Sequence, residues 1–510
     1  MGTVDGGGAA RVVRVLPDVA AIDKEFDYLV PDGVVVGVGD VVRIQLHGRR
    51  VGGWVTAVDV VPPPGVQLKP LAKVSGRGPA PELLDLATWA AWRWAGRRAT
   101  FLRTAAPPGV VRSLVSPARR TPEAPGDLGA AEREALGPDR AVLRLAPGVD
   151  RYPLVVGAIA MTTGFETHQT LVLCPSAGEA RALGARLRRD GHSVAVVVSD
   201  KAAAAAAGEW ALAAGGASVV LGARAAAWAP APHLGRVLVL DEHDERYQQE
   251  QSPTWHARDV AAERARRAGV PCLLVSPIPT LEALGWGELV VTDRATERNG
   301  WPHIDVVDQR DLDPSLGPLF SPALVNLVRG EGRVLCVLNR TGRARLLACG
   351  ACRTLARCEV CDAAVAQTDP PSDEYGEPSL PRFLCGRCGA GRPKVCLECG
   401  SSRFKNLRLG VSKAREELEV LAGEPVAEVT GTSDLADANL RSARLLIGTE
   451  AVLHRVHRAH AVAFLDFDQE LLALRYRAAE QALGLLARAG RIVRRGSGGR
   501  GRVLVQTRTP

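Results

Sequence analysis

Eight of the eleven cysteines form four Cys-x-x-Cys pairs within residues 349–399, in the order Cys349/Cys352, Cys358/Cys361, Cys385/Cys388 and Cys396/Cys399. A two-residue spacer lets both thiolates of a pair reach one metal ion from a tight turn, and eight thiolates are enough for two tetrahedral zinc sites. Four thiolates leave a zinc ion no open coordination position, so we expect two structural Zn2+ ions rather than a hydrolytic centre. The spacing alone allows either nested or consecutive pairing.

The composition describes a globular, multidomain chain with a modest basic excess. Its 510 residues suggest about three domains, and 46% hydrophobic with 24% charged residues excludes wholesale disorder. Lysine and arginine number 64 against 56 acidic residues, and this formal net charge of +8 suits a polyanionic partner without demonstrating one. We find neither a charge-free apolar run long enough to cross a membrane nor a signal-peptide pattern in residues 1–10, so we expect a cytoplasmic protein with no membrane partner.

The elements around the cysteines read as α/β domains preceded by a β domain. Short apolar runs alternate with turn residues over residues 11–61, which predicts a small, mostly β domain, and a helical period follows over residues 81–102. Residues 104–140 are rich in Pro, Gly, Ala and Arg and have no sustained period. From residue 141, strand-length apolar runs such as Leu154–Ala160 alternate with helical stretches, which predicts parallel sheets covered on both faces. The pattern breaks at the cysteines and then resumes, so the second sheet contains an insertion.

The order of these parts resembles the primosomal protein N′ (PriA) family of replication restart helicases. The stretches that carry the resemblance are Phe26-Asp27-Tyr28-Leu29-Val30-Pro31, residues 244–250 with 252–259, Leu338-Asn-Arg-Thr-Gly342, the four cysteine pairs, Arg488-Ala-Gly-Arg491 and Arg502-Val-Leu-Val-Gln-Thr507. Their order and joint spacing, rather than any single stretch, make the match specific.

The resemblance implies an α/β multidomain fold with two RecA-like (P-loop NTPase-type) lobes. It implies a 3′-end DNA-binding domain over 1–103, a linker or vestigial winged-helix region over 104–140, a degenerate lobe 1 over 141–298, and a lobe 2 over 299–510 interrupted by a zinc-binding insertion over 346–400. In the family the zinc sites are nested, which would place Cys349, Cys352, Cys396 and Cys399 on one ion and Cys358, Cys361, Cys385 and Cys388 on the other.

Two groups of residues match DNA-contacting positions of the family. In the first domain these are Phe26, Asp27 and Gly48, with Arg43 nearby; a ring can hold the terminal base, a carboxylate can accept from its hydroxyl, and a glycine lets the backbone come close. The alternative is that Phe26 is core and Asp27 a turn residue.

The second group matches an aromatic-rich loop of the family and consists of Tyr247, Trp255, His256 and Arg258. Rings can stack on unpaired bases and an arginine can bridge phosphates, which suits single-stranded DNA. The alternative is that these side chains pack the start of a helix.

The nucleotide-binding motifs of the family are degenerate in this chain. A phosphate loop requires Gly-x4-Gly-Lys-Ser/Thr, whereas the matching stretch reads Leu145-Ala-Pro-Gly-Val-Asp-Arg-Tyr152. Here Pro147 removes an N–H donor and Asp150 would repel a phosphate. The Mg2+-associated aspartate of the acidic box becomes Leu240, unless Asp241 substitutes after a one-residue slip.

Four residues remain as vestiges of the catalytic set, namely Asp241, Glu242, Arg488 and Arg491. Because the groups that would hold the phosphates are missing, we expect no ATPase activity and neither ATP nor Mg2+ bound. We expect Arg488 and Arg491 to form a basic strip with Arg494, Arg495, Arg500 and Arg502 that binds phosphate backbone, a solvated charged face being the alternative.

These features predict a nucleoid-associated replication restart protein that binds stalled or forked DNA, single strands and 3′ ends, and that assembles other primosome or replication proteins without helicase activity. Two alternatives are an active ATP-dependent 3′-to-5′ DNA helicase and a zinc-ribbon DNA-binding protein in transcription. The resemblance also leads us to expect a further domain after Pro510, so the chain has lost that part or is a fragment.

Overall fold

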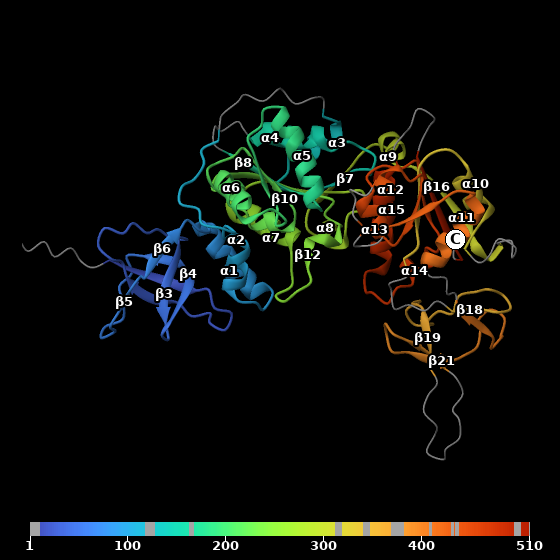
Figure 1. Cartoon of the computed structure of the whole chain (residues 1–510), viewed down its shortest axis with the longest axis horizontal. Coiled ribbons are helices and arrows are strands. Elements are labelled where there is room, and N and C mark those ends of the chain that lie inside the picture. The colour runs from blue at the N-terminus through green and yellow to red at the C-terminus, as the bar shows by residue number, and fades with distance from the viewer. Residues whose placement is uncertain are drawn as a thin grey trace, which may run out of the picture. The chain divides into compact units, whose positions relative to one another are not determined.

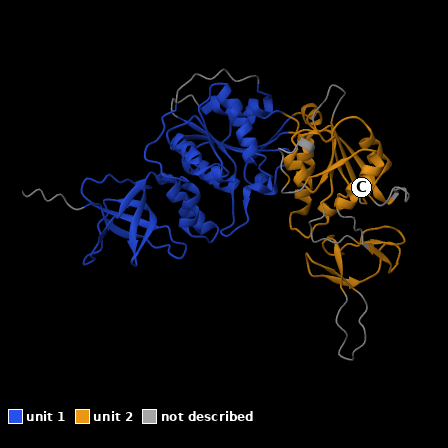
Figure 2. Cartoon of the chain, in the orientation of Figure 1, with its two compact units in different colours: residues 1–145, 150–292 blue, residues 146–149, 293–510 orange. Residues whose placement is uncertain are grey.

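A computed structural model describes residues 11–117, 128–162, 168–311, 319–339, 347–368, 382–406, 411–429, 433, 438–493 and 501–508. The chain forms two compact units, one of residues 1–145 with 150–292 and the other of residues 146–149 with 293–510 (Figure 2). Each unit is described by itself below.

The first unit begins with a closed β-barrel. Its strands are β1 (Val12–Pro17), β2 (Phe26–Leu29), β3 (Val41–Leu46), β4 (Arg49–Val58), β5 (Lys69–Pro70) and β6 (Lys73–Gly76), in the order β5-β2-β1-β4-β3-β6. The two residues between β5 and β6 close the sheet, because Leu71 N donates to Leu29 O (2.9 Å) and Ala72 N donates to Arg43 O (3.0 Å). Alternate apolar residues such as Val13, Val42 and Ile44 fill the interior.

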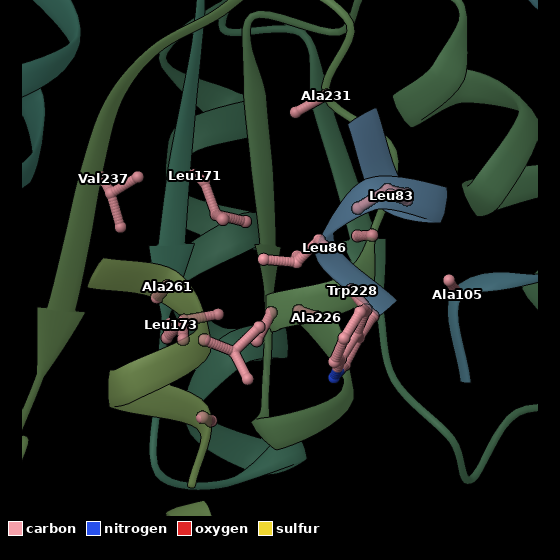
Figure 3. Packing of buried hydrophobic residues seen from close by; sticks show 14 of the residues in the cluster. Leu83, Leu86, Ala105, Leu171, Leu173, Ala226, Trp228, Ala231, Val237 and Ala261 are labelled. Atoms are coloured by element: carbon pink, nitrogen blue, oxygen red, sulfur yellow. The ribbon is translucent and has the colours of Figure 1, made fainter. Parts of the chain in front are cut away.

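Two helices, α1 (Pro81–Arg93) and α2 (Arg98–Ala105), join the barrel to the next domain (Figure 1). Leu83 and Leu86 of α1 belong to the same buried cluster as Leu171 and Trp228 of the following α/β domain (Figure 3). The indole Nε1 of Trp210 donates to Ala105 O at 2.9 Å, which ties the end of α2 to the same domain. The barrel domain and the first α/β domain therefore share one core.

Lobe 1 is a parallel α/β domain. Its elements are α3 (Ala130–Ala135), β7 (Arg140–Arg144), α4 (Tyr152–Thr162), β8 (Gln169–Leu173), α5 (Ala177–Arg189), β9 (Val194–Val197), α6 (Ala203–Ala214), β10 (Val219–Gly222), η1 (Arg224–Trp228), β11 (Leu234–Leu240), η2 (Glu245–Tyr247), β12 (Gln248–Gln249), β13 (Trp255–His256), α7 (Ala257–Ala268), β14 (Cys272–Ser276), α8 (Leu281–Leu284) and β15 (Glu288–Val291). The 7-stranded sheet has the order β15-β7-β14-β11-β8-β10-β9.

Lobe 2 repeats this topology. Its elements are α9 (Arg294–Gly300), β16 (His303–Asp308), η3 (Gln309–Asp311), α10 (Pro322–Arg329), β17 (Val334–Val337), α11 (Val411–Ala422), β23 (Val426–Val429), α12 (Ala438–Ser442), β24 (Leu445–Gly448), α13 (Ala451–Arg455), β25 (Ala461–Phe464), α14 (Asp468–Leu471), α15 (Ala478–Ile492) and β26 (Arg502–Thr507). The 6-stranded order β16-β26-β25-β17-β24-β23 is 1-6-5-2-4-3 by position along the lobe, and lobe 1 has this same order with β15 added at its edge. Both lobes are RecA-like.

A small cysteine module is inserted between β17 and α11 of lobe 2. It contains β18 (Leu347–Cys349), β19 (Val365–Thr368), β20 (Arg382–Cys385), β21 (Gly391–Pro393) and β22 (Phe404–Asn406), arranged as a two-stranded and a three-stranded sheet. The module is fastened to the loop after α14, because Arg387 Nη2 donates to Ala473 O (2.6 Å) and Ala364 N donates to Leu472 O (3.3 Å).

One predicted element is wrong and one is divided. The run Leu154–Ala160 is helical, as part of α4, rather than a strand. A continuous apolar run fits a buried helix as well as a buried strand. The helix expected over residues 81–102 is two helices, α1 and α2, and the expected domain limit at 103/104 falls inside α2. None of the helices in the described ranges is long and apolar enough to cross a membrane.

Candidate functional site

The cysteine module brings the eight thiols together in two sets of four. One set is Cys349, Cys352, Cys396 and Cys399, and the other is Cys358, Cys361, Cys385 and Cys388. Within each set, the two Cys-x-x-Cys pairs approach each other closely. The Sγ–Sγ distances between the pairs are 3.5 Å for Cys349–Cys399, Cys352–Cys396, Cys358–Cys388 and Cys361–Cys385. A zinc ion with four S ligands at about 2.3 Å would separate them by about 3.8 Å. Each set therefore fits one tetrahedral zinc ion, and the pairing is the nested one that the resemblance implied.

All four Cys-x-x-Cys turns have the same backbone geometry. The residue after the second cysteine has a positive φ in each turn, at Arg353 (64°), Asp362 (57°), Gly389 (75°) and Gly400 (72°). The N–H of this residue donates to the carbonyl of the first cysteine of the pair at 3.0 Å in all four turns. Backbone N–H groups also point at sulfur, as from Val360 N to Cys358 Sγ at 3.4 Å. Such N–H groups stabilise thiolates, the form that binds metal.

The stretch that matches the phosphate loop lies between β7 and α4 and is occupied by an internal ion pair. Counted from Leu145 as the first loop position, Arg151 stands where the motif has lysine. Its Nη1 lies 2.5 Å from Asp241 Oδ2, and its Nη2 lies 3.2 Å from Glu179 Oε2. The Asp241 side chain is only 5% exposed. The cation that would meet a terminal phosphate is thus bound by two carboxylates of its own lobe.

The neighbours of Arg151 are also bound, in each case by helix α5 or its C-cap. Asp150 accepts from Arg186 Nη1 at 2.9 Å, and the Tyr152 hydroxyl donates to Asp190 while Arg186 stacks on the Tyr152 ring at 3.6 Å. Burial raises the pKa of Asp150, but the Tyr152 N–H and Arg186 outweigh it and leave that pKa below its usual value. Ionised Asp150 stands at the position of the second glycine of the motif, where it repels phosphate.

The acidic box after β11 is used for internal contacts as well. Buried Glu242 accepts from Thr280 N (2.8 Å), Thr280 Oγ1 (2.9 Å) and Arg258 Nη1 (2.9 Å). His243 Nδ1 and Ser276 Oγ are 2.8 Å apart. These bonds join the loops after β11 and β14 to helix α7 at the carboxyl edge of the sheet, the edge at which ligands of α/β domains bind.

The residues of the aromatic-rich loop are mostly buried, contrary to the direct DNA contact expected of them. Tyr247 has no exposed surface and its hydroxyl donates to Leu240 O at 2.6 Å. The Trp255 ring is packed edge-on against Trp228, which contacts Phe101 of α2, and Arg258 is held by Glu242. These three side chains are therefore part of the packing of lobe 1, whereas His256 is half-buried, at the start of α7.

The residues expected at a 3′ end lie on two faces of the barrel. Phe26 packs on the barrel core, whereas Asp27, the next residue, faces outward and binds Arg14 at 2.8 Å. The Tyr28 hydroxyl donates to Gln45 O at 3.2 Å, and β2 is antiparallel to β3, so Phe26 and Gly48 lie at the same end of the barrel. Gly48 and His47 both have positive φ (76° and 46°), as a two-residue hairpin turn requires. Arg43 is exposed on the outer face of β3.

Of the arginines expected to form a basic strip, three lie in the described residues: Arg488, Arg491 and Arg502. Arg488 Nε donates to Leu453 O at 3.1 Å within lobe 2, and Arg491 follows near the end of α15. Arg502 binds Asp305 at 2.7 Å, so it is paired rather than part of an unpaired strip. Arg494, Arg495 and Arg500 lie outside the described residues.

Comparison with known proteins agrees with this arrangement of parts. The model of the PriA 3′ DNA-binding domain (3′BD) matches residues 14–107. The probable replication restart protein PriA of Mycobacterium leprae is 29% identical over 96% of this chain and 80% of its own length. PriA of Bacillus subtilis is 30% identical over 57% of this chain and 38% of its own. The chain belongs to the PriA family.

Two solved structures match this chain with low TM-scores and low sequence identity. MrfA, a DUF1998 helicase bound to DNA, matches with a TM-score of 0.41 and 10% identity over 78% of this chain and 50% of that chain. A DEAD box protein of Methanococcus jannaschii matches with a TM-score of 0.36 and 11% identity over 74% and 86%.

The degenerate phosphate-loop motif of this PriA-family chain could be seen in the sequence. The ion pairs of Arg151 with Asp241 and Glu179, which occupy its place, were not predicted. Arg151 was the signal, because it occupies the lysine position and is itself a cation. Its partner Glu179 lies two residues into α5 and belongs to no motif, so only the structure places it.

Proposed function

We propose that this PriA-family chain is a replication restart protein that binds forked and single-stranded DNA at a 3′ end, carries two structural Zn2+ ions and does not unwind DNA with ATP. The observation that carries the last part is the Arg151 guanidinium, bound by Asp241 and Glu179 where ATP would need a free cation and a free metal ligand.

Nucleotide binding would have to undo these contacts. The Asp241 side chain is only 5% exposed, and breaking a buried ion pair by removing one partner costs about 3–5 kcal/mol in comparable pairs. The loop offers little in return, because Pro147 has no N–H and Asp150 is held ionised by Arg186. Glu242, the remaining acid of the box, already accepts three hydrogen bonds. The site supports a folded lobe rather than phosphoryl transfer.

DNA binding is supported by the barrel domain. It matches the 3′ DNA-binding model over residues 14–107, and Phe26 with the Gly48 turn lies at one end of it. Leu16 and Trp54 of the barrel strands belong to the same buried cluster as α1, α2 and lobe 1, so the barrel is packed on that lobe through these residues. In this proposal the protein acts on chromosomal DNA in the cytoplasm and recruits other replication proteins to the fork.

Zinc has a structural role in this proposal. Each set of four thiolates leaves no coordination position for substrate, and the turns are closed by their own backbone hydrogen bonds. The ions would cross-link a module with small sheets and a small apolar core around Phe383.

The test measures ATP hydrolysis and fork binding on one preparation of the full chain. We expect binding to forks with a free 3′ end, and phosphate release equal to a protein-free blank with and without forks. Fork-stimulated turnover that disappears in Asp241→Ala or Arg491→Ala would overturn the proposal in favour of an active helicase. A preference for duplex promoters over forks would favour the transcription alternative.

A further inference from the structure

The outer face of the barrel carries basic side chains at adjacent positions of three neighbouring strands. Arg43 and Gln45 alternate with buried Val42, Ile44 and Leu46 along β3, so they point away from the core. In the pairing of β3 with its neighbours, Arg43 is opposite Lys73 of β6 and Gln45 is opposite Arg50 of β4. We call Arg43, Arg50 and Lys73 the basic face.

Other arginines of the barrel domain are bound to acids. Arg11 binds Asp59 (2.9 Å), Arg14 binds Asp27 (2.8 Å), Arg98 binds Asp23 (3.1 Å) and Glu25 (2.6 Å), and Arg103 binds Asp18 (2.5 Å). Within the described residues, by contrast, no ion pair joins any of the three residues of the basic face to an acid. Asp18, whose carboxylate lies beside Gly52 on β4, is bound by Arg103.

The pairing of Arg43 with Lys73 has a cost that folding alone does not explain. Like charges directly opposite each other on neighbouring strands destabilise a sheet. The partner of Arg43 on the other side is Gly52, and the side chains of Arg43 and Asp18 lie over this glycine. An extended anion lying across β6 and β3 would relieve the repulsion between Arg43 and Lys73.

We propose that the basic face binds the phosphate backbone of DNA beyond the captured 3′ end, independently of base sequence. This inference rests on the proposed function, because it assigns a second contact to the same DNA-binding domain. A polyanion of regular charge spacing fits several cations in adjacent rows of a sheet, and arginine forms paired hydrogen bonds with phosphate. The face would thus fix the path of the strand, while the barrel end selects the terminus.

The salt dependence of binding tests this contact. Each phosphate contact contributes about 0.7 to the slope of log affinity against log salt for single strands. We therefore expect the full-length variant Arg43→Gln/Arg50→Gln/Lys73→Gln to lose about 2 from that slope. The matched control, Arg11→Gln/Arg133→Gln/Arg266→Gln, removes the same net charge elsewhere in the same unit and should leave the slope within about 0.5 of the unmodified chain. Melting temperatures show that both variants fold.

A second measurement separates this inference from the proposed function. Each protein is titrated with oligonucleotides ending in a 3′-hydroxyl or a 3′-phosphate. If the basic face binds backbone, the triple variant weakens both by the same factor. An unmodified chain without any preference for the hydroxyl end would refute the 3′-end function and leave the backbone contact standing. An unchanged slope in the folded triple variant would overturn the contact and make an acidic protein the partner that this face fits.

Discussion

The cysteine module and the stretch that matches a phosphate loop differ in how their ligand-binding groups are used. The module keeps its metal-binding groups together, whereas the charged groups of the loop bind one another. In the module all eight donors are present, each turn has the same positive-φ residue, and the sulfurs lie at metal-binding distances. In the loop the lysine position holds an arginine that binds Asp241 and Glu179, and the flanking residues are bound by α5.

The difference shows what each site needs when its ligand is missing. Thiolates gathered for an ion have no substitute partner in the module, so loss of zinc would leave it without its cross-links. The charges around Arg151 neutralise one another, so lobe 1 does not need a ligand to balance them. We infer that the module still depends on its ligand, whereas lobe 1 has become independent of one.

The largest effect should come from breaking a zinc site. Cys358→Ser should lower the zinc content of the reduced protein from two ions per chain to one and unfold the module, because structural zinc contributes about 10 kcal/mol or more to such folds. Zinc content by elemental analysis and proteolysis of residues 347–406 would measure both. Cys272→Ala, which removes a buried thiol of lobe 1, should change neither. Fewer than one ion in the unmodified chain would contradict the assignment.

The next largest effect should come from Arg151. Arg151→Ala leaves Asp241 buried beside Glu179 without its cation, so we expect the free energy of unfolding of lobe 1 to fall by about 3 kcal/mol. Arg186→Ala, which removes a more exposed partner of Asp150, should cost less than about 1 kcal/mol. Urea unfolding of both variants gives the comparison.

The effect of nucleotide on the melting temperature of Arg151→Ala and of the unmodified chain shows whether Arg151 serves only the fold, through Asp241 and Glu179, or still contacts a nucleotide. If the lobe still bound Mg·ATP through this arginine, saturating nucleotide would raise the melting temperature of the unmodified chain and not of the variant. We expect no shift in either protein.

The sequence predicts these two regions unequally, for physical reasons. The cysteine spacing states its ligand number and geometry directly, and the parallel sheets follow from apolar runs separated by helical stretches. The ion pair between Arg151 and Glu179 could not be predicted, because Glu179 meets Arg151 only in the folded lobe, through the placement of α5. Likewise, Tyr247 and Trp255 have the residue types of a DNA contact, and only packing against Trp228 and Leu240 shows that they are buried.

Lobe 2 contains a buried carboxylate, Glu470, whose partner Arg475 does not offset the cost of burying its charge. Burial and the neighbouring Glu450 raise the pKa of Glu470 to about 7, against the opposing effects of Asn339 and Arg475. The folded state therefore holds a proton that the unfolded chain releases near pH 4.5, so stability is greatest below that pH and falls by on the order of 2–3 kcal/mol as pH rises to 7.

Glu470→Gln should remove this dependence, because glutamine stays neutral. We expect the variant to match the unmodified chain near pH 4.5 and to be more stable at pH 8, as read from unfolding midpoints across that range. Glu480→Gln, at a half-buried carboxylate bound to Arg477, is the control and should keep the pH profile of the unmodified chain. Parallel profiles for Glu470→Gln and the unmodified chain would mean that the pKa of Glu470 is the same in the folded and the unfolded state.

The smallest effect on folding should come from Asp27, whose substitution tests function almost alone. The side chain of its partner Arg14 is 38% exposed, so solvent screens the pair and Asp27→Asn should cost less than about 1 kcal/mol of stability. If the carboxylate receives the terminal hydroxyl of DNA, the same change should abolish the preference for 3′-hydroxyl over 3′-phosphate ends. Asp59→Asn, in the Arg11 pair of the same barrel, should keep that preference. Because Asp27 faces away from Phe26, a preference that survives Asp27→Asn would confine the end-binding site to the inner face around Phe26 and the Gly48 turn.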